Sequence, residues 1–274
     1  MTNCNDPFVA TLNEKGYHLV AYPKTSIKPL HVYQSIEERK FIRLFVKSDV
    51  KNTSGFLKEM FQNHSGEIGI EQGEGIGIDT ITSQKVKSEV SAKILTNYLN
   101  TLLPQEKRMA ENQVKALFAN TEHVVFKIDE IKTIDANEIA LRNWLNDNQN
   151  ELRDIYKTDI ESGTLYLATS LLKSSKVTLT CERSSTASIA ADLANAFNLP
   201  LSEGNIKYEQ ESSNSDKIIY TGTEGIIFGV KLVRLKFSPK GILTIDNRQD
   251  FNRVLGENID ADFYKTNEGL VDIE

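Results

Sequence analysis

The residues best suited to chemistry in this chain are four histidines and two cysteines, and their spacing matches no known catalytic or metal site. The histidines are scattered along the chain: His18, His31, His64 and His123. Zinc-type sites need such residues at short, regular ligand spacings. We therefore interpret each histidine as structural or exposed. The cysteines, Cys4 and Cys181, are too few for a disulfide framework or a cysteine-based metal site.

Motifs for nucleophilic, metal-dependent or phosphate chemistry are also missing. The chain contains no G-x-S-x-G, no H-E-x-x-H and no P-loop. The glycine-rich run from Gly73 to Gly77 lacks the G-x-G-x-x-G spacing of a dinucleotide cradle. Basic residues are dispersed and the pI is near 5.4, which argues against nucleic-acid binding. We predict a non-catalytic protein with no cofactor and no metal.

The overall composition is that of a globular protein. Of the 274 residues, 39% are hydrophobic and 26% are charged. No run approaches the ~20 apolar residues of a membrane-spanning helix. The polar stretch from Met1 to Phe8 lacks the apolar centre of a signal peptide. We expect the intact protein to be cytoplasmic.

The excess negative charge is concentrated at the C-terminus. Residues 256–274 contain six acidic residues and one lysine, a net charge of −5 out of −6 for the whole chain. A solvated acidic end is the common interpretation of such a tail. The alternative is a detachable regulator, whose removal leaves a body of net charge −1 that is better suited to an anionic surface.

The order of predicted elements favours an α+β fold. Strands are expected near 17–22, 41–47 and 124–128, and the run 217–220 and 226–237 predicts two paired strands joined by a glycine-containing connection. An Asp135 capping box predicts a helix to about Asn148. Strands and helices mix without the regularity of βαβ units, which is typical of antiparallel sheets with helices around them.

Two segments alternate apolar and polar residues, and the first is Glu67–Ile81. Its apolar face is made only of isoleucines: Ile68, Ile70, Ile76 and Ile78. The intervening positions carry acids and glycines. The pattern predicts a one-sided strand or a short hairpin.

The second alternating segment is Gly163–Arg183. Its predicted apolar face contains Leu165, Leu167 and Leu171, and then Val177, Leu179 and Cys181. The polar run Lys173–Lys176 predicts a turn between two strands.

For both segments, a sheet with one face on the core is the ordinary interpretation. The functional interpretation is an amphipathic hairpin that turns its apolar face to lipid. Open sheet edges are not tolerated in hydrocarbon, so such strands must close into a barrel, and two hairpins per chain require a large ring of subunits.

The N-terminal region carries a family resemblance. The segments Cys4–Val9, Lys15–Val20 and Pro23–Leu30 resemble the N-terminus of bacterial gasdermins. The resemblance extends over most of the chain through total length, element order, the two alternating segments and a very short C-terminal tail.

The resemblance implies a twisted antiparallel sheet with surrounding helices over residues 1–255, restrained by a short inhibitory peptide at 256–274. It implies a cytoplasmic monomer that a caspase-like protease activates by removing the peptide. The freed domain then enters the inner (plasma) membrane, assembles into large homo-oligomeric β-barrel pores and kills the cell in defence against phage. It also implies a palmitoyl group on Cys4, the position that matches the family's acylated cysteine.

A lipid on Cys4 has a physical limit. Each buried methylene contributes about 0.8 kcal/mol, and a single acyl chain anchors only marginally. We expect acylation to assist insertion and not to drive it.

The cleavage site is predicted between Leu255 and Gly256, where the charge turns acidic and glycine makes the bond accessible. Arg253 remains an alternative for a basic-specific protease, and Asp250 or Asp260 for an aspartate-specific one. Beyond the cut, the tail has apolar residues that are candidates for docking on the body: Ile259, Phe263, Tyr264 and Leu270.

A second function remains open at this stage. The chain could instead be a soluble, non-catalytic interaction module whose acidic tail recruits a partner.

Overall fold

The computed structural model describes residues 12, 14–24, 27–36, 41–44, 55–74, 80–84, 96, 99–100, 108–110, 112–114, 121–183, 206–212, 215–246 and 270–271. Cys4, the predicted cleavage bond and most of the tail lie outside these residues.

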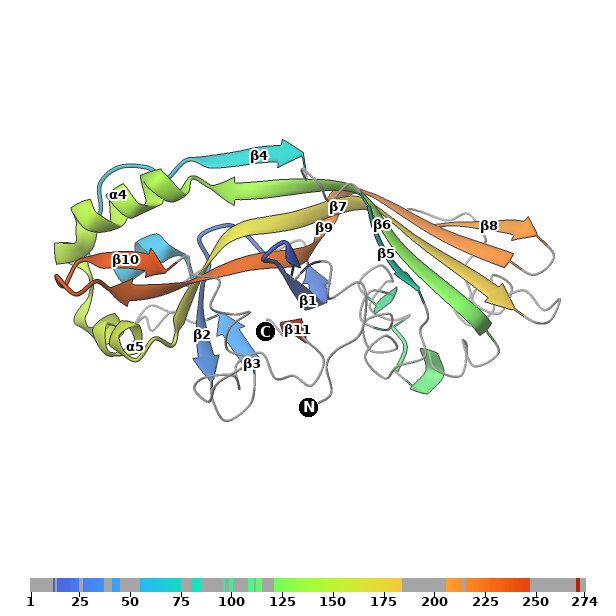
Figure 1. The fold of residues 1–274 in the computed structure, drawn as a ribbon, viewed down its shortest axis with the longest axis horizontal. Helices are drawn as coiled ribbons and strands as arrows, with labels where there is room; N and C mark the ends of the chain where they lie inside the picture. The colour runs from blue at the N-terminus through green and yellow to red at the C-terminus, as the bar shows by residue number, and fades with distance from the viewer. Residues whose placement is uncertain are drawn as a thin grey trace.

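Three long antiparallel strands form the frame of the molecule (Figure 1). They are β6 (Thr121–Ala136), β7 (Leu165–Arg183) and β9 (Ser215–Phe237), and β7 lies between the other two. Because β7 is hydrogen-bonded on both edges for most of its length, it is the central strand of the sheet.

Short strands line the outer edges of this frame. On β9 lie β8 (Ile206–Ser212), β1 (His18–Lys24) and β10 (Leu243–Asp246). On β7 lies β2 (Val32–Ile36), followed by β3 (Phe41–Leu44). On β6 lie β4 (Ile70–Glu74) and β5 (Thr80–Gln84). The last strand, β11 (Leu270–Val271), runs parallel to β1, whereas the other described pairings are antiparallel.

The helices that the structure describes in full lie at one end of the sheet (Figure 1). They are α4 (Glu138–Asn148), α5 (Lys157–Glu161) and the short 3-10 turns η1 (Leu57–Met60), η3 (Gln149–Glu151) and η4 (Asp154–Tyr156). The predicted α+β class with a central antiparallel sheet is confirmed.

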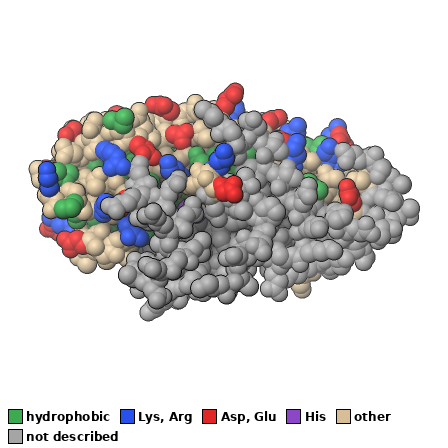
Figure 2. Space-filling view, in the orientation of Figure 1, with side chains coloured by type: hydrophobic (Ala, Val, Ile, Leu, Met, Phe, Trp, Pro, Cys, Tyr) green, Lys and Arg blue, Asp and Glu red, His purple; other side chains and the backbone are tan. Residues whose placement is uncertain are grey.

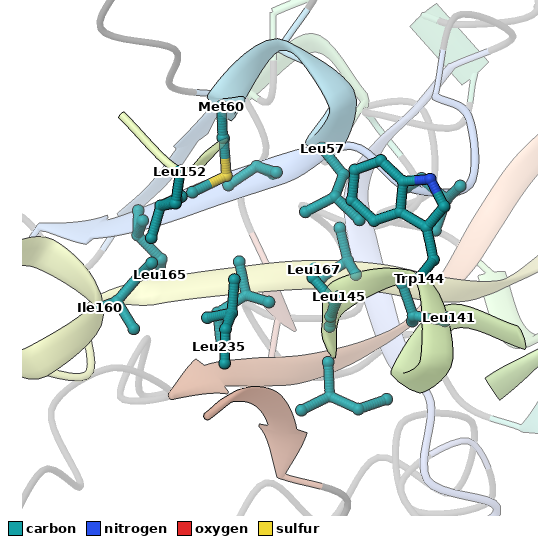
Figure 3. Close-up of a cluster of buried hydrophobic side chains, with 14 of the residues drawn as sticks. Leu57, Met60, Leu141, Trp144, Leu145, Leu152, Ile160, Leu165, Leu167 and Leu235 are labelled. Carbon is teal, nitrogen blue, oxygen red and sulfur yellow. The ribbon is translucent and has the colours of Figure 1, made fainter. Parts of the chain in front are cut away.

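The main core lies where α4 covers this end of the sheet (Figure 3). Trp144 packs edge-to-face on Phe61 at 4.8 Å between ring centroids, and its indole N–H donates to the carbonyl of Gly66 at 3.3 Å. Leu165 and Leu167 of β7 are completely buried beneath the helix. Burial of each such leucine contributes about 1.5–3 kcal/mol.

Two predicted strand boundaries are wrong in the same way. Lys173–Lys176 is not a turn, because β7 runs unbroken from Leu165 to Arg183. The predicted connection between 220 and 226 is likewise part of the single strand β9. In both places, residues typical of turns lie at an irregular point inside a continuous strand.

The predicted cap at Asp135 is also wrong. Asp135 still belongs to β6, where it stands opposite Ser170 and Glu71. The N-cap is Asn137, whose side-chain oxygen accepts from the N–H of Ala140 at 3.0 Å. Within the described residues, no helix is long and apolar enough to cross a membrane.

Candidate functional site

One half of the sheet has a buried face and a solvent face. In β7, the side chains of Val177, Leu179 and Cys181 are each less than 5% exposed. Glu182, which points to the other face of the strand, is exposed. The neighbouring strands extend the same buried face with Ile128 of β6 and Ile218 of β9. The alternation predicted for this stretch is therefore confirmed, although Thr178 on the other face is buried as well.

The polar face of this half carries charges of both signs. Lys127 pairs with Asp129 at 2.9 Å and Lys207 with Glu209 at 2.5 Å. Figure 2 shows acidic and basic side chains interspersed over the described part of the face in view. A sheet with one apolar and one polar face has the pattern that strands need when one side meets lipid and the other meets water.

The other half of β7 is buried on both faces, which corrects the one-sided alternation predicted there. All three predicted leucines are fully buried, but they do not share one face. Leu165 and Leu167 lie in the core under α4, whereas Leu171 packs with Ala168 in a second cluster on the opposite face, because the register shifts between Ala168 and Ser170. The near-continuous apolar sequence of this stretch is typical of a strand covered on both sides. The near-continuous apolar sequence therefore distinguishes this half of β7 from the alternating half that follows it.

The first alternating segment is split by the structure. Ile68 precedes β4 and is buried in the core with Trp144. All five residues of β4 are exposed, and Ile70 is 46% exposed. β4 and β5 follow one another along the same edge of β6, so they do not pair as a hairpin. Ile76 and Ile78 lie outside the described residues.

The tail reaches the sheet through β11. Leu270 stands opposite Leu19, and Val271 opposite Val20, in the parallel pair with β1. Leu19 and Val20 are fully buried, and β1 is itself paired with β9. The other predicted docking residues, Ile259, Phe263 and Tyr264, and the predicted cleavage bond between Leu255 and Gly256 lie outside the described residues.

The strand that precedes the tail is held by α4. Arg142 donates to the hydroxyl of Thr244 at 3.1 Å and to the carbonyl of Ile245 at 3.0 Å. Gln149 accepts from the N–H of Leu243 at 3.2 Å. β10 is therefore fixed to the helical end of the sheet, whereas β11 docks on β1.

The model of the bacterial gasdermin family matches residues 20–247. The chain belongs to the bacterial gasdermin family. Its members are non-enzymatic pore-forming effectors. In the described part of the chain, no group of three or more His, Cys, Asp or Glu residues is arranged to hold a metal ion.

Individual relatives agree with this assignment. This gasdermin is 48% identical to the gasdermin bGSDM of Runella zeae over 258 residues, covering 93% of each chain. It is 24% identical to gasdermin bGSDM of a Vitiosangium species, over 83% of this chain and 80% of the relative. The structure of a bacterial gasdermin from Bradyrhizobium tropiciagri has the same fold, with a TM-score of 0.62 and 14% identity over 99% of this chain and 98% of the other.

The apolar face of this half of the sheet includes residues that the sequence prediction did not name. They are Ile128 of β6 and Ile218 of β9. A signal was available for β6, where Val124, Phe126 and Ile128 recur with a period of two, but residues 216–220 of β9 do not alternate.

Proposed function

We propose that this gasdermin is held inactive by its C-terminal tail, residues 256–274, and that proteolysis between Leu255 and Gly256 releases it to form β-barrel pores. The intact monomer stays in the cytoplasm. The cut form enters the inner membrane, oligomerises and kills the cell as a defence against phage. The activating enzyme is a caspase-like protease.

The observation that supports this most directly is the half-sheet with one apolar face. Val177 and Leu179 supply the lipid-facing side from the centre of that half, and Thr180 and Glu182 lie on the side that would face water. Leu165, Leu167 and Leu171 are buried on a part of β7 that has no polar face. We assign insertion to the first group and the folded body of each subunit to the second.

The described contact between the tail and the sheet supports the role of a lock. The described pairing between β11 and β1 covers two residues of each strand. A short strand that is covalently tethered binds as an intramolecular ligand, and the same strand on a free peptide loses that advantage. Cutting the chain therefore weakens the lock without altering any contact within it.

Cys4 is proposed as the acylation site, with a palmitoyl group joined through a thioester. A single chain gives weak anchoring, so its role is to favour insertion of a domain that has already been released. Intact mass measurement of protein purified from its native host should find a mass increase that Cys4→Ser abolishes. An unmodified mass in native material would remove this part of the proposal.

The central test is leakage of a trapped dye from liposomes. A recognition site for a sequence-specific protease is inserted between Leu255 and Gly256, and the uncut protein, the cut protein and the same protease without gasdermin are compared. We expect leakage only from the cut protein. A cleanly cut, folded protein that releases no dye from vesicles of any composition, including lipids of the host membrane, would refute the pore-forming mechanism.

A further inference from the structure

The three long strands become irregular at the same level of the sheet, where they change direction together (Figure 1). In β9, four residues separate Thr221 from Ile226, whereas their partners Lys176 and Ser174 on β7 are separated by one. In β6, Glu130 has a positive φ of 53°, which is uncommon for a residue other than glycine. These two irregularities flank the same point of β7.

The pairing register of the outermost edge shifts at the same level. Glu74 at the end of β4 stands opposite Lys132, and Thr80 at the start of β5 stands opposite Asp129. Five sequence positions separate Glu74 from Thr80, whereas two separate their partners Lys132 and Asp129 on β6. The line of irregularity crosses the sheet from the β4–β5 edge to β9. We call this line the bend and define it by Glu130, Ser174 and residues 222–225.

Ser174 lies at the centre of the bend with a completely buried side chain. Its hydroxyl oxygen is 2.6 Å from the carbonyl oxygen of Asp129 and 2.8 Å from that of Lys176, so its single proton is placed between two acceptors. The same oxygen accepts from the N–H of Lys176 at 3.0 Å. The hydroxyl thus links the backbone of β7 to the backbone of β6 at a point where the ladder is distorted.

β9 is fitted to Ser174 from the other side. Gly225 has a φ of 65°, and a Cβ at this position would lie 2.9 Å from the carbonyl oxygen of Ser174. Only glycine accepts both this close approach and this backbone conformation without strain. The backbone around Ser174 is therefore packed tightly between β6 and β9 in the bent form.

The bend also marks the change in burial along β7. Toward Leu165, up to Leu172, both faces of the strand are buried, and from Lys176 toward Arg183 only one face is apolar. The part that must stay folded as a body and the part suited to face lipid thus meet at Ser174. A sheet that carries one part into a membrane while the other stays outside has to change its angle at this boundary.

We propose that the bend is a hinge and that Ser174 is the positioning residue whose hydroxyl holds it in the resting angle. The inference rests on the proposed pore-forming function, and it identifies the position in the sheet at which the movement takes place. When the tail is released, the hydrogen bonds of Ser174 to Asp129 and Lys176 break, and the one-sided half swings relative to the half covered by α4.

The test compares Ser174→Ala with Ser175→Ala in the full chain. The neighbouring Ser175 hydroxyl bonds the carboxylate of Glu130 at 2.9 Å on the exposed side, so its removal leaves the buried link to the backbone intact. Hydrogen–deuterium exchange of the resting protein should quicken about tenfold or more at residues 129–131 and 174–177 in Ser174→Ala. Ser175→Ala and the amides of 165–167 should stay within about twofold of the unmodified chain.

Dye leakage after tail removal supplies the second readout. A hinge freed of its hydroxyl should shorten the lag before leakage by about threefold or more for Ser174→Ala, with Ser175→Ala unchanged. An unchanged lag alongside faster exchange would overturn the hinge and leave Ser174 as a purely structural residue. If neither the unmodified chain nor the variants leak, the pore-forming proposal has failed, and the exchange data still decide whether the bend opens locally.

A third measurement needs no variant and covers the case in which Ser174→Ala does not fold. In the unmodified full chain, native-state exchange in low denaturant should show the bend amides opening before those of 165–167. Simultaneous opening of both sets at every denaturant concentration would contradict a local hinge.

Discussion

Leu270, near the C-terminus, lies directly opposite Leu19 in a parallel strand pair that is two residues long. Leu19 is fully buried and belongs to β1, which is itself paired with β9. The last described residues of the chain are thereby joined to the sheet through a strand near its beginning. This relationship supplies a direct test of the tail as a lock.

Removing β11 should release the protein without proteolysis. A chain that ends after Gly269 keeps most of the acidic tail but lacks both residues of the strand, and we expect it to leak dye from liposomes without any cut. A chain that ends after Asp272 keeps Leu270 and Val271 and serves as the matched control, which should stay inactive. Equal silence of the two chains would show that the lock lies elsewhere in the tail.

The division of β7 into two halves predicts different effects of equally buried leucines. Leu179→Ser and Leu167→Ser both remove a buried side chain, and each should lower the free energy of unfolding by about 2–5 kcal/mol. After tail removal, Leu179→Ser should cut dye release tenfold or more, because the proposed pore places this face against lipid, where a polar side chain is destabilising. Leu167→Ser should retain most of it.

Dye release by the two variants is compared at a temperature at which circular dichroism shows that both are folded. Loss of leakage with Leu167→Ser and its retention with Leu179→Ser would reverse the assignment of the two halves. Denaturant titration of the uncut proteins gives the stability cost separately from the leakage.

Trp144 is the single tryptophan of the chain and reports on the half that we expect to remain folded. Its side chain is 4% exposed and is packed on Phe61. Emission should therefore stay blue-shifted when the cut protein binds liposomes. A red shift to the emission of a water-exposed indole would mean that the α4 end of the sheet opens as well. Unfolding in denaturant gives the reference spectrum.

Acid should destabilise the resting protein through two buried histidines. Burial lowers the pKa of His18 to about 4, and burial together with the nearby Lys28 charge lowers that of His31 to about 4. In the unfolded chain both titrate near 6.5. Between these values the unfolded chain binds more protons, so the free energy of unfolding should fall as the pH drops from about 6.5 to 4.

The measurement is denaturant unfolding at several pH values. His18→Gln should flatten part of the slope in this window, and substitution of the exposed His64 by glutamine provides the control that leaves it unchanged. A slope that survives loss of both His18 and His31 would assign the acid sensitivity to the carboxylates.

Local pattern was sufficient for the fold class and for the one-sided stretch at Val177 and Leu179, because a period of two follows directly from the geometry of a strand. It failed at Ser174 and Gly225. Both residues lie in sequences typical of turns, yet β7 and β9 continue through them. The Ser174 hydroxyl donates to the backbone of β6, and Gly225 lets β9 approach β7 closely. That distinction depends on residues 45 or more positions apart in the chain, which no local pattern contains.

The partial success at the candidate site has the same cause. Leu270 could be singled out as an apolar residue in a polar tail, but its partner Leu19 could not, because parallel pairing between distant segments leaves no periodic trace. Family resemblance, in contrast, was readable from the N-terminal segments alone, and the family match over residues 20–247 bears it out.

The distance along the chain between β10 and β11 has one more consequence. In sequence, 23 residues, 247 to 269, connect Asp246 at the end of β10 with Leu270 on β1. A segment joined covalently to its binding site has a high effective concentration there, and the same segment on a free peptide loses that advantage. In the proposed mechanism, a break at any bond between these two strands removes the advantage, so inhibition ends wherever between them the protease cuts.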